Sequence, residues 1–432
     1  MKILNWNQLS TEAQAEALSR SPLVDEGELG KQVADIMARV RSGGDAALAA
    51  LSKQFDKCQP ESLRLTPSEI DAACARVSPS LKSAIALAMA NIEAFHSAQQ
   101  FEPLCINTMA GVRCELRSEA LDSVGLYIPG GSAPLISTVL MLALPARIAG
   151  CRRRVLVSPP PIDDAIIYAA RECGIDEIYQ CGGAQAIAAL AFGTESIAAV
   201  DKIFGPGNRY VTEAKRQLAQ TPGLKTAIDM PAGPSEVLVI ADAGANPAFV
   251  AADLLSQAEH GPDSQAMLVT DSDTLAGQVV AELAKQLEQL PRKAIAQEAL
   301  ANSRILLTQS LAQAVAVSNS YGPEHLIVQT HAPRDLLPAI RSAGSVFLGA
   351  YTPESVGDYA SGTNHVLPTY GYSRTVSSLS LADFSRRFTV QELSREGLAN
   401  LGQAVITLAN AEALNGHANA VAIRLQTGES PV

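Results

Sequence analysis

The chain has 432 residues, 47% hydrophobic and 18% charged, which is the composition of a folded protein too long for a single core. Its formal net charge of −11 argues against nucleic acid or an anionic membrane as a partner, because phosphate binding needs clustered Lys and Arg. The N-terminus is too polar for a signal peptide, no apolar run reaches the ~18 residues of a membrane span, and the seven cysteines form no C-x-x-C pair. We therefore expect a cytoplasmic protein.

The N-terminal part is expected to be helical, because residues 9–100 are rich in Ala, Leu and Glu and contain few strand formers. One helix start is explicit. Thr66 and Glu69 form a capping box, and Pro67 occupies the first helical position. The pattern predicts one helix over residues 67–98.

The middle of the chain alternates strands with helices, which indicates parallel sheets with right-handed crossovers. An exposed strand pair is expected first, at residues 112–123, where charged and apolar residues alternate. A first set of strands is expected at 124–128, 155–158, 177–180 and 202–204. A second set is expected at 236–240, 266–270, 304–308, 325–328 and 345–348.

This order predicts an α/β fold with two parallel-sheet, incomplete Rossmann-like domains, one inserted in the other. Residues 1–123 and 236–378 are expected to form the first domain together with the N-terminal helices, and residues 124–235 the inserted domain. Residues 379–432 are expected to form a helical C-terminal tail. The tail has little apolar surface of its own, so we expect it to dock elsewhere, such as on a second subunit.

Three glycine-rich turns, at residues 129–131, 182–185 and 205–208, each follow a predicted strand and open a helix. Their helix N-termini would lie at one edge of one sheet and could hold a pyrophosphate. The alternative is that they are ordinary tight βα turns, because the chain contains no G-x-G-x-x-G.

The stretch from residue 228 to residue 260 combines a Gly/Pro turn, a buried strand and a helix with a polar end. Gln257 and His260 are three residues apart, so on a helix they share one face and can point at the same atom. A turn that presents the Ser235 hydroxyl beside such a helix end indicates a binding site.

Four histidines lie in polar segments rich in small residues, namely His260, His325, His365 and His417. A single histidine is more often structural, but four flanked by Asp, Glu and Gln favour a metal or acid–base centre, since zinc takes imidazole nitrogen and carboxylate oxygen. We expect their loops at the carboxyl ends of parallel strands.

Glu324 and His325 are adjacent and could serve successive proton transfers. Neighbours in a strand face opposite ways, so the pair can act together only at a strand edge or turn, which Gly-Pro at residues 322–323 supplies.

Three segments closely resemble the histidinol dehydrogenase family. They are residues 228–260, with the motif Ala-Gly-Pro-Ser-Glu and the closing Glu-His, residues 322–325, and residues 357–365. The likeness extends over nearly the whole chain.

The resemblance implies an oxidoreductase with one Zn²⁺ per subunit that converts L-histidinol to L-histidine in two NAD-linked steps through an aldehyde. It also implies a homodimer with exchanged tails and shared active sites. The implied zinc ligands, which also lie against the substrate, are Gln257, His260, Asp358 and His417. Further implied substrate contacts are Ser235, His325, His365 and Glu412, the catalytic bases are Glu324 and His325, and the NAD contacts are Tyr127, Gln185 and Asn208.

Two other functions fit parts of the pattern. A zinc hydrolase with Glu324 as base would share the metal cluster but would not need the glycine turns. A non-catalytic small-molecule binding protein with two α/β lobes would need neither, and a metal-free preparation that still binds ligand would favour it.

Overall fold

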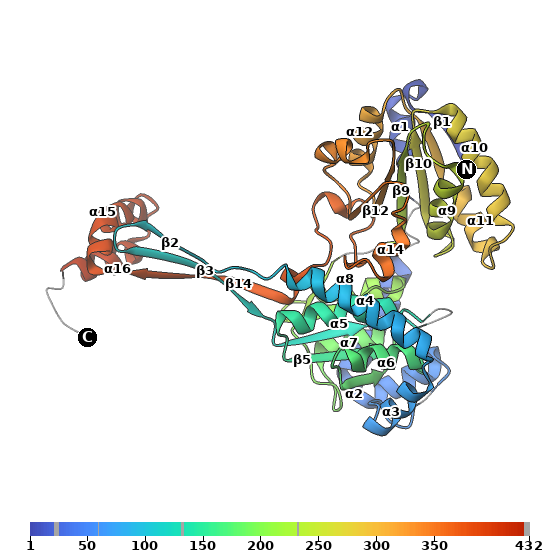
Figure 1. The fold of residues 1–432 in the computed structure, drawn as a ribbon. Helices are drawn as coiled ribbons and strands as arrows, with labels where there is room; N and C mark the ends of the chain where they lie inside the picture. Colours follow the sequence, from blue (N-terminus) through green and yellow to red (C-terminus); the bar gives the residue numbers. More distant parts are fainter. Residues whose placement is uncertain (21–25, 59, 131–133, 231–232, 427–432) are drawn as a thin grey trace. The chain divides into compact units, whose positions relative to one another are not determined.

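A computed structural model describes residues 1–20, 26–58, 60–130, 134–230 and 233–426 (Figure 1). The chain divides into two compact units, Met1–Gln99 with Leu121–Phe384, and Gln100–Ala120 with Ser385–Val432. The first unit contains two parallel sheets, and the second contains an antiparallel sheet. Within the described part of the chain, every helix falls short of the length or the apolarity that a bilayer crossing requires.

The larger parallel sheet has six strands in the order β1-β11-β10-β9-β12-β13. These are β1 (Lys2–Asn5), β9 (Glu236–Ala241), β10 (Gln265–Thr270), β11 (Arg304–Leu307), β12 (His325–Gln329) and β13 (Ser345–Leu348). Every residue of β9, β10 and β12 is buried, as expected for parallel strands that are covered on both faces. Strand β1 pairs with β11 at the edge and was not expected from the sequence.

Helices cover both faces of this sheet. One face packs against α9 (Pro247–Ala258), α10 (Asp273–Leu287) and α11 (Lys293–Ala301). The other packs against α1 (Thr11–Ala17) and α12 (Leu311–Tyr321). Two short helices, α13 (Pro333–Leu336) and α14 (Glu354–Tyr359), follow β12 and β13.

The second parallel sheet has five strands in the order β6-β5-β4-β7-β8. These are β4 (Ser123–Tyr127), β5 (Arg153–Ser158), β6 (Glu177–Gln180), β7 (Lys202–Phe204) and β8 (Ala227–Ile228). When the strands are numbered from β9 in the larger sheet and from β4 in the smaller one, both sheets contain the order 3-2-1-4-5. The first unit is therefore built from two halves that share the same doubly wound topology. The helices between these strands are α5 (Ile136–Ala149), α6 (Asp164–Glu172), α7 (Gly183–Phe192) and α8 (Arg209–Ala219).

The N-terminal helices pack on the five-stranded sheet, which differs from the expected grouping of residues 1–123 with 236–378. Helix α2 (Glu26–Phe55) joins α7 and α8 on one face, and α3 (Pro67–Arg76) and α4 (Pro79–Ser97) join α5 and α6 on the other. Both faces of a parallel sheet must be covered. Helices α2, α3 and α4 complete the cover that the four helices between the strands of this sheet provide. Only the first 20 residues or so, with β1 and α1, belong to the six-stranded sheet.

The single helix expected over residues 67–98 is two helices. The capping box at Thr66 is present as predicted, with the Glu69 side chain accepting a 2.7 Å hydrogen bond from the Thr66 backbone. Val77 is extended, however, and Ser78 caps a new helix whose first residue is Pro79. A residue that precedes a proline disfavours helical backbone angles, so the helix breaks here.

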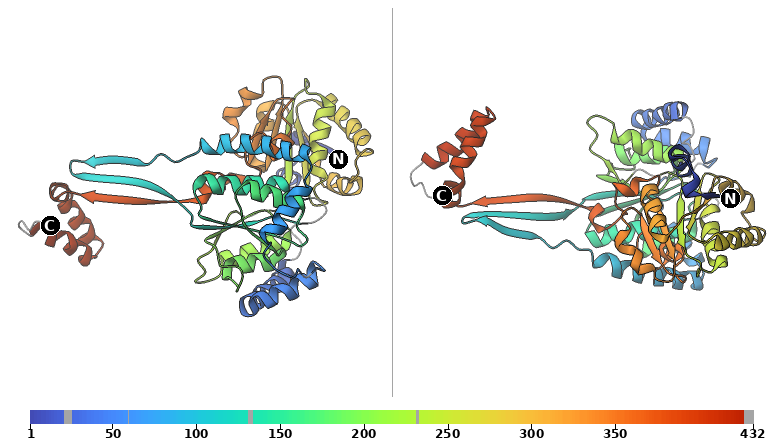
Figure 2. Two further views of the ribbon diagram at one scale, coloured as in Figure 1. Left: turned by 60° about the horizontal axis from the view of Figure 1, so that its bottom comes forward. Right: turned by 90° about the horizontal axis from the view of Figure 1, so that it is seen from above.

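The second unit contains the antiparallel strands β2 (Leu104–Met109), β3 (Val112–Ala120) and β14 (Ser385–Leu393), followed by α15 (Arg395–Ala411) and α16 (Asn415–Gln426) (Figure 2). The expectation of a wholly helical tail over residues 379–432 is therefore wrong for β14, and residues 427–432 lie outside the described part. Strand β14 pairs with β3 along its full length, from Ser385 opposite Ala120 to Leu393 opposite Val112. Short 3₁₀ turns complete the chain at Trp6–Gln8, Leu337–Ala339, Tyr372–Arg374 and Leu381–Phe384.

Candidate active site

The candidate catalytic residues lie at the amino edge of the six-stranded sheet. Glu236 is the first residue of β9, and His325 is the first residue of the adjacent strand β12. Helices α9 and α14 follow β9 and β13 and bring His260 and Asp358 back toward this edge. The expectation that these loops lie at the carboxyl ends of strands is therefore wrong for this sheet, because the functional groups follow the returning helices instead of the strands.

Both catalytic candidates are held by the backbone of Glu236. Its N–H donates a 2.9 Å hydrogen bond to Glu324 Oε2, and its carbonyl oxygen lies 3.1 Å from His325 Nδ1. Because a carbonyl only accepts, Nδ1 carries a proton, and Nε2 is the ring nitrogen left to take up or release one. His325 Nε2 faces Asp358 Oδ1 at 3.5 Å. The orientation and the tautomer of His325 are thus set by main-chain atoms.

Glu324 and His325 are both buried, with exposed fractions of 6% and 5%. Burial raises the pKa of Glu324 to about 8. Burial opposes a charge on His325, but the carboxylates of Glu324 and Asp358 outweigh it and raise the pKa of His325 above its ordinary value. The protons of two such coupled groups belong to the pair, so a carboxyl and an imidazole side by side can pass protons in both directions.

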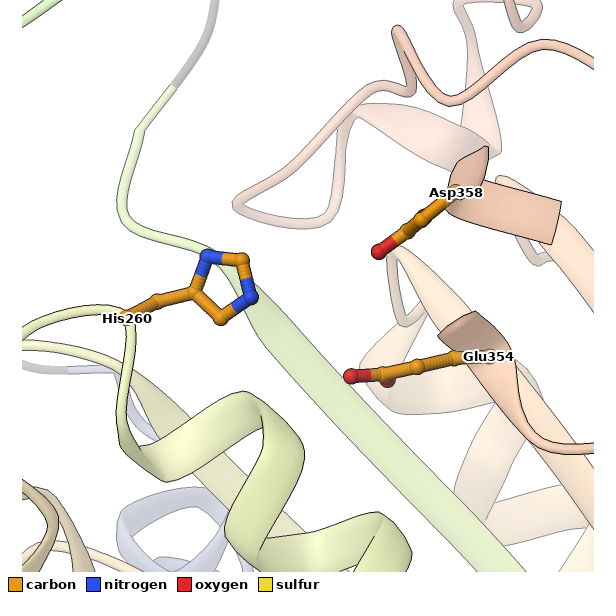
Figure 3. A group of neighbouring side chains, drawn as sticks. All are labelled: His260, Glu354 and Asp358. Carbon is orange, nitrogen blue, oxygen red and sulfur yellow. The ribbon is translucent and has the colours of Figure 1, made fainter. Parts of the chain in front are cut away.

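Beside this pair lies a cluster of one imidazole and two carboxylates, shown in Figure 3. One ligand atom each from His260, Glu354 and Asp358 lies within 4.8 Å of the others. Glu354 and Asp358 are four residues apart in α14 and therefore share a face, and the His260 ring is turned toward both. Imidazole nitrogen with carboxylate oxygen is a donor set that suits Zn²⁺.

The sequence reasoning missed Glu354. Its side chain is 1% exposed, and burial raises its pKa to about 7. Among the described residues, Glu354 Oε2 has no hydrogen-bond partner. The spacing Glu-x-x-x-Asp in a helix was a usable signal, since it predicts two carboxylates on one face.

Gln257 lies in the last turn of α9 and is 1% exposed. Neither its side-chain oxygen nor its side-chain nitrogen has a hydrogen-bond partner in the described part of the chain. A buried amide without partners is costly, so this position fits a group that supplies them, such as a cation or a substrate.

His365 borders the cluster, and Ser235 lies next to Glu236 in the chain. His365 Nδ1 lies 2.9 Å from the Asp358 carbonyl oxygen, and its Nε2 lies 3.2 Å from Thr138 Oγ1 on α5. Burial lowers the pKa of His365 below its ordinary value, which favours the neutral ring. Ser235 is half-buried and directly precedes Glu236. Ala232 of the same predicted turn lies outside the described residues.

Glu412 and His417 belong to the second unit. Glu412 is the C-cap residue directly after α15, His417 lies in α16, and both side chains are exposed. Their assignment to the site rests on the sequence resemblance.

The proposed NAD residues lie at the carboxyl edge of the five-stranded sheet. Tyr127 ends β4, and its hydroxyl accepts a 3.2 Å hydrogen bond from the Gly183 N–H. Burial raises the pKa of Tyr127 to about 12, so the phenol stays protonated. A side chain at Gly205, whose φ is 128°, would collide with the Tyr127 carbonyl oxygen. The turns after β6 and β7 therefore meet at Tyr127, beside the topological switch point between β4 and β7.

Two further residues of these turns are defined by their helices. Gln185 lies in the first turn of α7 and is 2% exposed. Asn208 caps α8, with Oδ1 accepting from the backbone N–H groups of Tyr210 and Val211. The side-chain nitrogen Nδ2 of Asn208 is therefore the group that could donate to a ligand. Gly131 of the first turn lies outside the described residues.

The comparisons with known proteins agree over nearly the whole length. The family model described as histidinol dehydrogenase matches residues 19–425. The histidinol dehydrogenase of Shewanella oneidensis is 67% identical over 98% of this chain and 99% of its own, and that of Vibrio parahaemolyticus is 58% identical over 99% of both. The crystal structure of histidinol dehydrogenase from Elizabethkingia anophelis matches with a TM-score of 0.95 and 47% identity, covering 99% of this chain and 98% of that one. The chain belongs to the histidinol dehydrogenase family.

Proposed function

We propose that this chain oxidises L-histidinol to L-histidine in two consecutive NAD-linked steps, with the aldehyde retained in the site. The balance is one alcohol, two NAD⁺ and one water giving one carboxylate, two NADH and three protons. The observation that carries the proposal is the buried Glu324–His325 pair, held by the Glu236 backbone beside the cluster of His260, Glu354 and Asp358.

In the first step, His325 accepts the hydroxyl proton of histidinol at Nε2. An alcohol is a poor hydride donor until this proton leaves, and the hydride then passes to NAD. The arrangement supports this role because Nδ1 is already engaged by the Glu236 carbonyl oxygen, so that only Nε2 is free to accept.

In the second step, Glu324 activates the water that converts the aldehyde into its hydrate. The second hydride leaves from this hydrate, and His325 accepts the remaining hydroxyl proton. A carboxyl whose pKa is raised to about 8 suits this role, because it is basic enough to take a proton and acidic enough to release it afterwards.

The ligands proposed for one Zn²⁺ per subunit are Gln257, His260 and Asp358 together with His417 of the partner subunit. The residues present fit the ion, since the His260 and Asp358 atoms converge and the buried Gln257 amide has no partner among the described residues. A bound Zn²⁺ would supply positive charge that stabilises the developing alkoxide and orients the substrate imidazole. The chain's own contribution to substrate binding comes from Ser235, His325 and His365, with Glu412 of the partner subunit.

The proposed NAD contacts are Tyr127, Gln185 and Asn208. They come from three turns at one sheet edge, where the N-termini of α7 and α8 can hold a pyrophosphate. The reduced nicotinamide must leave and a second NAD must enter between the two steps, which fits turns at an exposed edge.

The functional unit is proposed to be a homodimer in which each second unit completes the other subunit's site. Apolar side chains that would be buried in such a dimer are exposed on both outer strands of the second unit, namely Leu104, Ile106 and Met109 on β2 and Phe388 and Leu393 on β14. Apolar groups gathered on one small unit are typical of a surface that contacts another protein. We place the dimer in the cytoplasm.

The decisive experiment measures NADH and product together. Purified protein supplied with histidinol and excess NAD should yield two NADH for each histidine, with no free aldehyde trapped by semicarbazide. Accumulation of aldehyde at one NADH per alcohol would disprove the two-step assignment. Ester or amide cleavage without NADH would support the hydrolase instead, and ligand binding without either reaction would support a binding protein.

A further inference from the structure

An ion pair lies directly behind the catalytic pair. Arg20, three residues beyond α1, donates from Nε to both carboxylate oxygens of Glu236 at 3.1 and 3.0 Å, and its Nη2 lies 2.8 Å from Oε2. The Glu236 side chain is 2% exposed and that of Arg20 is 15% exposed. The Tyr370 backbone N–H also donates to this carboxylate. Glu236 is therefore fixed from two sides.

The same guanidinium also binds the chain that leads into Glu324. Arg20 Nη2 donates to the carbonyl oxygens of Tyr321 at 2.9 Å and Gly322 at 3.2 Å, and the guanidinium carbon lies 3.9 Å from the centre of the Tyr321 ring. Gly322 has a φ of 65°, which reverses the chain before Glu324. Arg20 thus ties the start of β9 to the turn before β12.

The N-terminal segment that carries Arg20 is anchored independently. Gln265, the first residue of β10, donates from Nε2 to the Ser19 carbonyl oxygen at 3.1 Å and accepts from the Tyr321 hydroxyl at 2.6 Å. Arg20 is therefore held by its own backbone neighbour as well as by its head group.

We propose that Arg20 is a positioning residue for the reaction and acts through Glu236. The inference rests on the proposed roles of Glu324 and His325. Glu236 offers its backbone N–H to Glu324 and its carbonyl to His325, so any displacement of the Glu236 backbone moves both groups at once. A bidentate Arg–carboxylate pair fixes direction as well as distance, whereas a buried ion pair contributes little net stability compared with apolar residues.

The chain offers a closely matched control. Arg153 donates from Nε to both carboxylate oxygens of Glu177 at 3.1 and 3.2 Å, and from Nη1 to the carbonyl oxygens of Ala198 and Ala199 at 3.0 and 3.2 Å. It makes the same kinds of bond as Arg20, but at the amino edge of the other sheet. Arg153→Gln therefore reproduces the loss of a forked ion pair without touching Glu236.

The experiment compares Arg20→Gln, Arg20→Lys and Arg153→Gln as full-length, zinc-loaded enzymes. Arg20→Gln should lower kcat about 10- to 100-fold, as expected for catalytic groups displaced by a fraction of an ångström to an ångström, with the KM for histidinol changed less than about threefold. Arg20→Lys keeps the charge but loses the fork, so its kcat should be intermediate. Bound zinc should be unchanged in all three, and Arg153→Gln should keep kcat within about twofold while losing less thermal stability than Arg20→Gln, because the Arg153–Glu177 pair is more exposed.

The proposal is overturned if Arg20→Gln loses no more kcat than Arg153→Gln, or if its loss lies in KM alone. Should Arg20→Gln fail to fold, Arg20→Lys decides in its place, and native kcat in that variant overturns the proposal. Glu324→Gln and His325→Gln are measured alongside. If these two retain activity, the proposed function of the pair has failed; if they lose it while the Arg20 variants do not, only the present inference has failed.

Discussion

The Ser256 hydroxyl donates a 2.9 Å hydrogen bond to Oε1 of Glu354. This contact occupies one carboxylate oxygen, while Oε2 is buried without a hydrogen-bond partner in the described part of the chain. Ser256 therefore holds Glu354 through Oε1, and Oε2 stays available to a cation bound by the cluster that contains His260 and Asp358. A carboxylate placed in this way adds negative charge beside the proposed cation.

Glu354→Gln should weaken zinc binding about 10- to 100-fold, because the substitution removes this charge and keeps the shape. Zinc affinity is measured by competition with a chromogenic chelator, followed by metal analysis of the dialysed protein. Glu298→Gln is the control, since Glu298 is exposed on α11. Equal zinc affinity in the two variants would show that Glu354 does not support the ion.

Glu324→Gln should slow the oxidation of the aldehyde more than the oxidation of the alcohol, because only the second step needs an activated water. Removal of one general base typically costs about 10²–10⁴ in rate. His325→Gln should slow both steps, since His325 is proposed to accept a proton in each. Single-turnover measurements that start from histidinol and from the aldehyde separate the steps, and an equal loss in both for Glu324→Gln would contradict this division of roles.

Heterodimers should reveal whether sites are shared between subunits. A purified heterodimer of one His260→Asn chain and one His417→Asn chain combines both lesions in one site and leaves the other intact, so about half of the native activity should return. A heterodimer of His260→Asn with Gln257→Ala damages both sites and should stay inactive. If the first heterodimer is as inactive as its parents, His417 acts within its own subunit.

Asp253 should make the protein less stable as the pH rises. Burial raises its pKa to about 7, although a hydrogen bond from Gln329 Nε2 favours its charged form. Between about pH 4 and about pH 7 the folded chain therefore binds more protons than the unfolded chain, and the free energy of unfolding falls through this window by up to about 4 kcal/mol.

Asp253→Asn removes this titration. The variant should exceed the native chain in stability at about pH 8 and differ from it less at about pH 5, as measured by urea unfolding. Glu298→Gln again serves as a control, because Glu298 is exposed on α11. A constant difference between the Asp253→Asn and native chains at both pH values would show that Asp253 is ionised in the folded protein.

Elements set by local pattern could be predicted from the sequence. The β-branched and aromatic runs at Glu177–Gln180, Lys202–Phe204 and Ser345–Leu348 form strands with the expected bounds. The capping box at Thr66 is also present. Such signals depend on neighbouring residues only, and the regular alternation of strands and helices then predicts two parallel sheets.

Features set by distant partners could not be predicted. Strand β14 gains its hydrogen bonds from β3, more than 260 positions earlier in the chain (residue 385 pairs with residue 120), and its local sequence alone predicts a helix. The break before Pro79 was missed although its signal was local, because the surrounding apolar pattern continues across it. The roles of Glu236 and Arg20 depend on contacts with residue 324 and residue 322, which no spacing in the sequence encodes.

The two halves of the first unit share one strand order but carry their proposed sites at opposite ends of it, and these two ends differ in electrical character. At the carboxyl edge of the five-stranded sheet, α7 and α8 present their N-termini, whose partial positive charge attracts an anion such as a dinucleotide phosphate. At the amino edge of the six-stranded sheet, α9 and α12 present their C-termini, whose carbonyl groups attract cations. The guanidinium of Arg20 already lies against the last carbonyls of α12, and the polar end of α9 carries His260. A single duplicated architecture can thus serve a negatively charged cofactor at one end and a positively charged ion and amine substrate at the other.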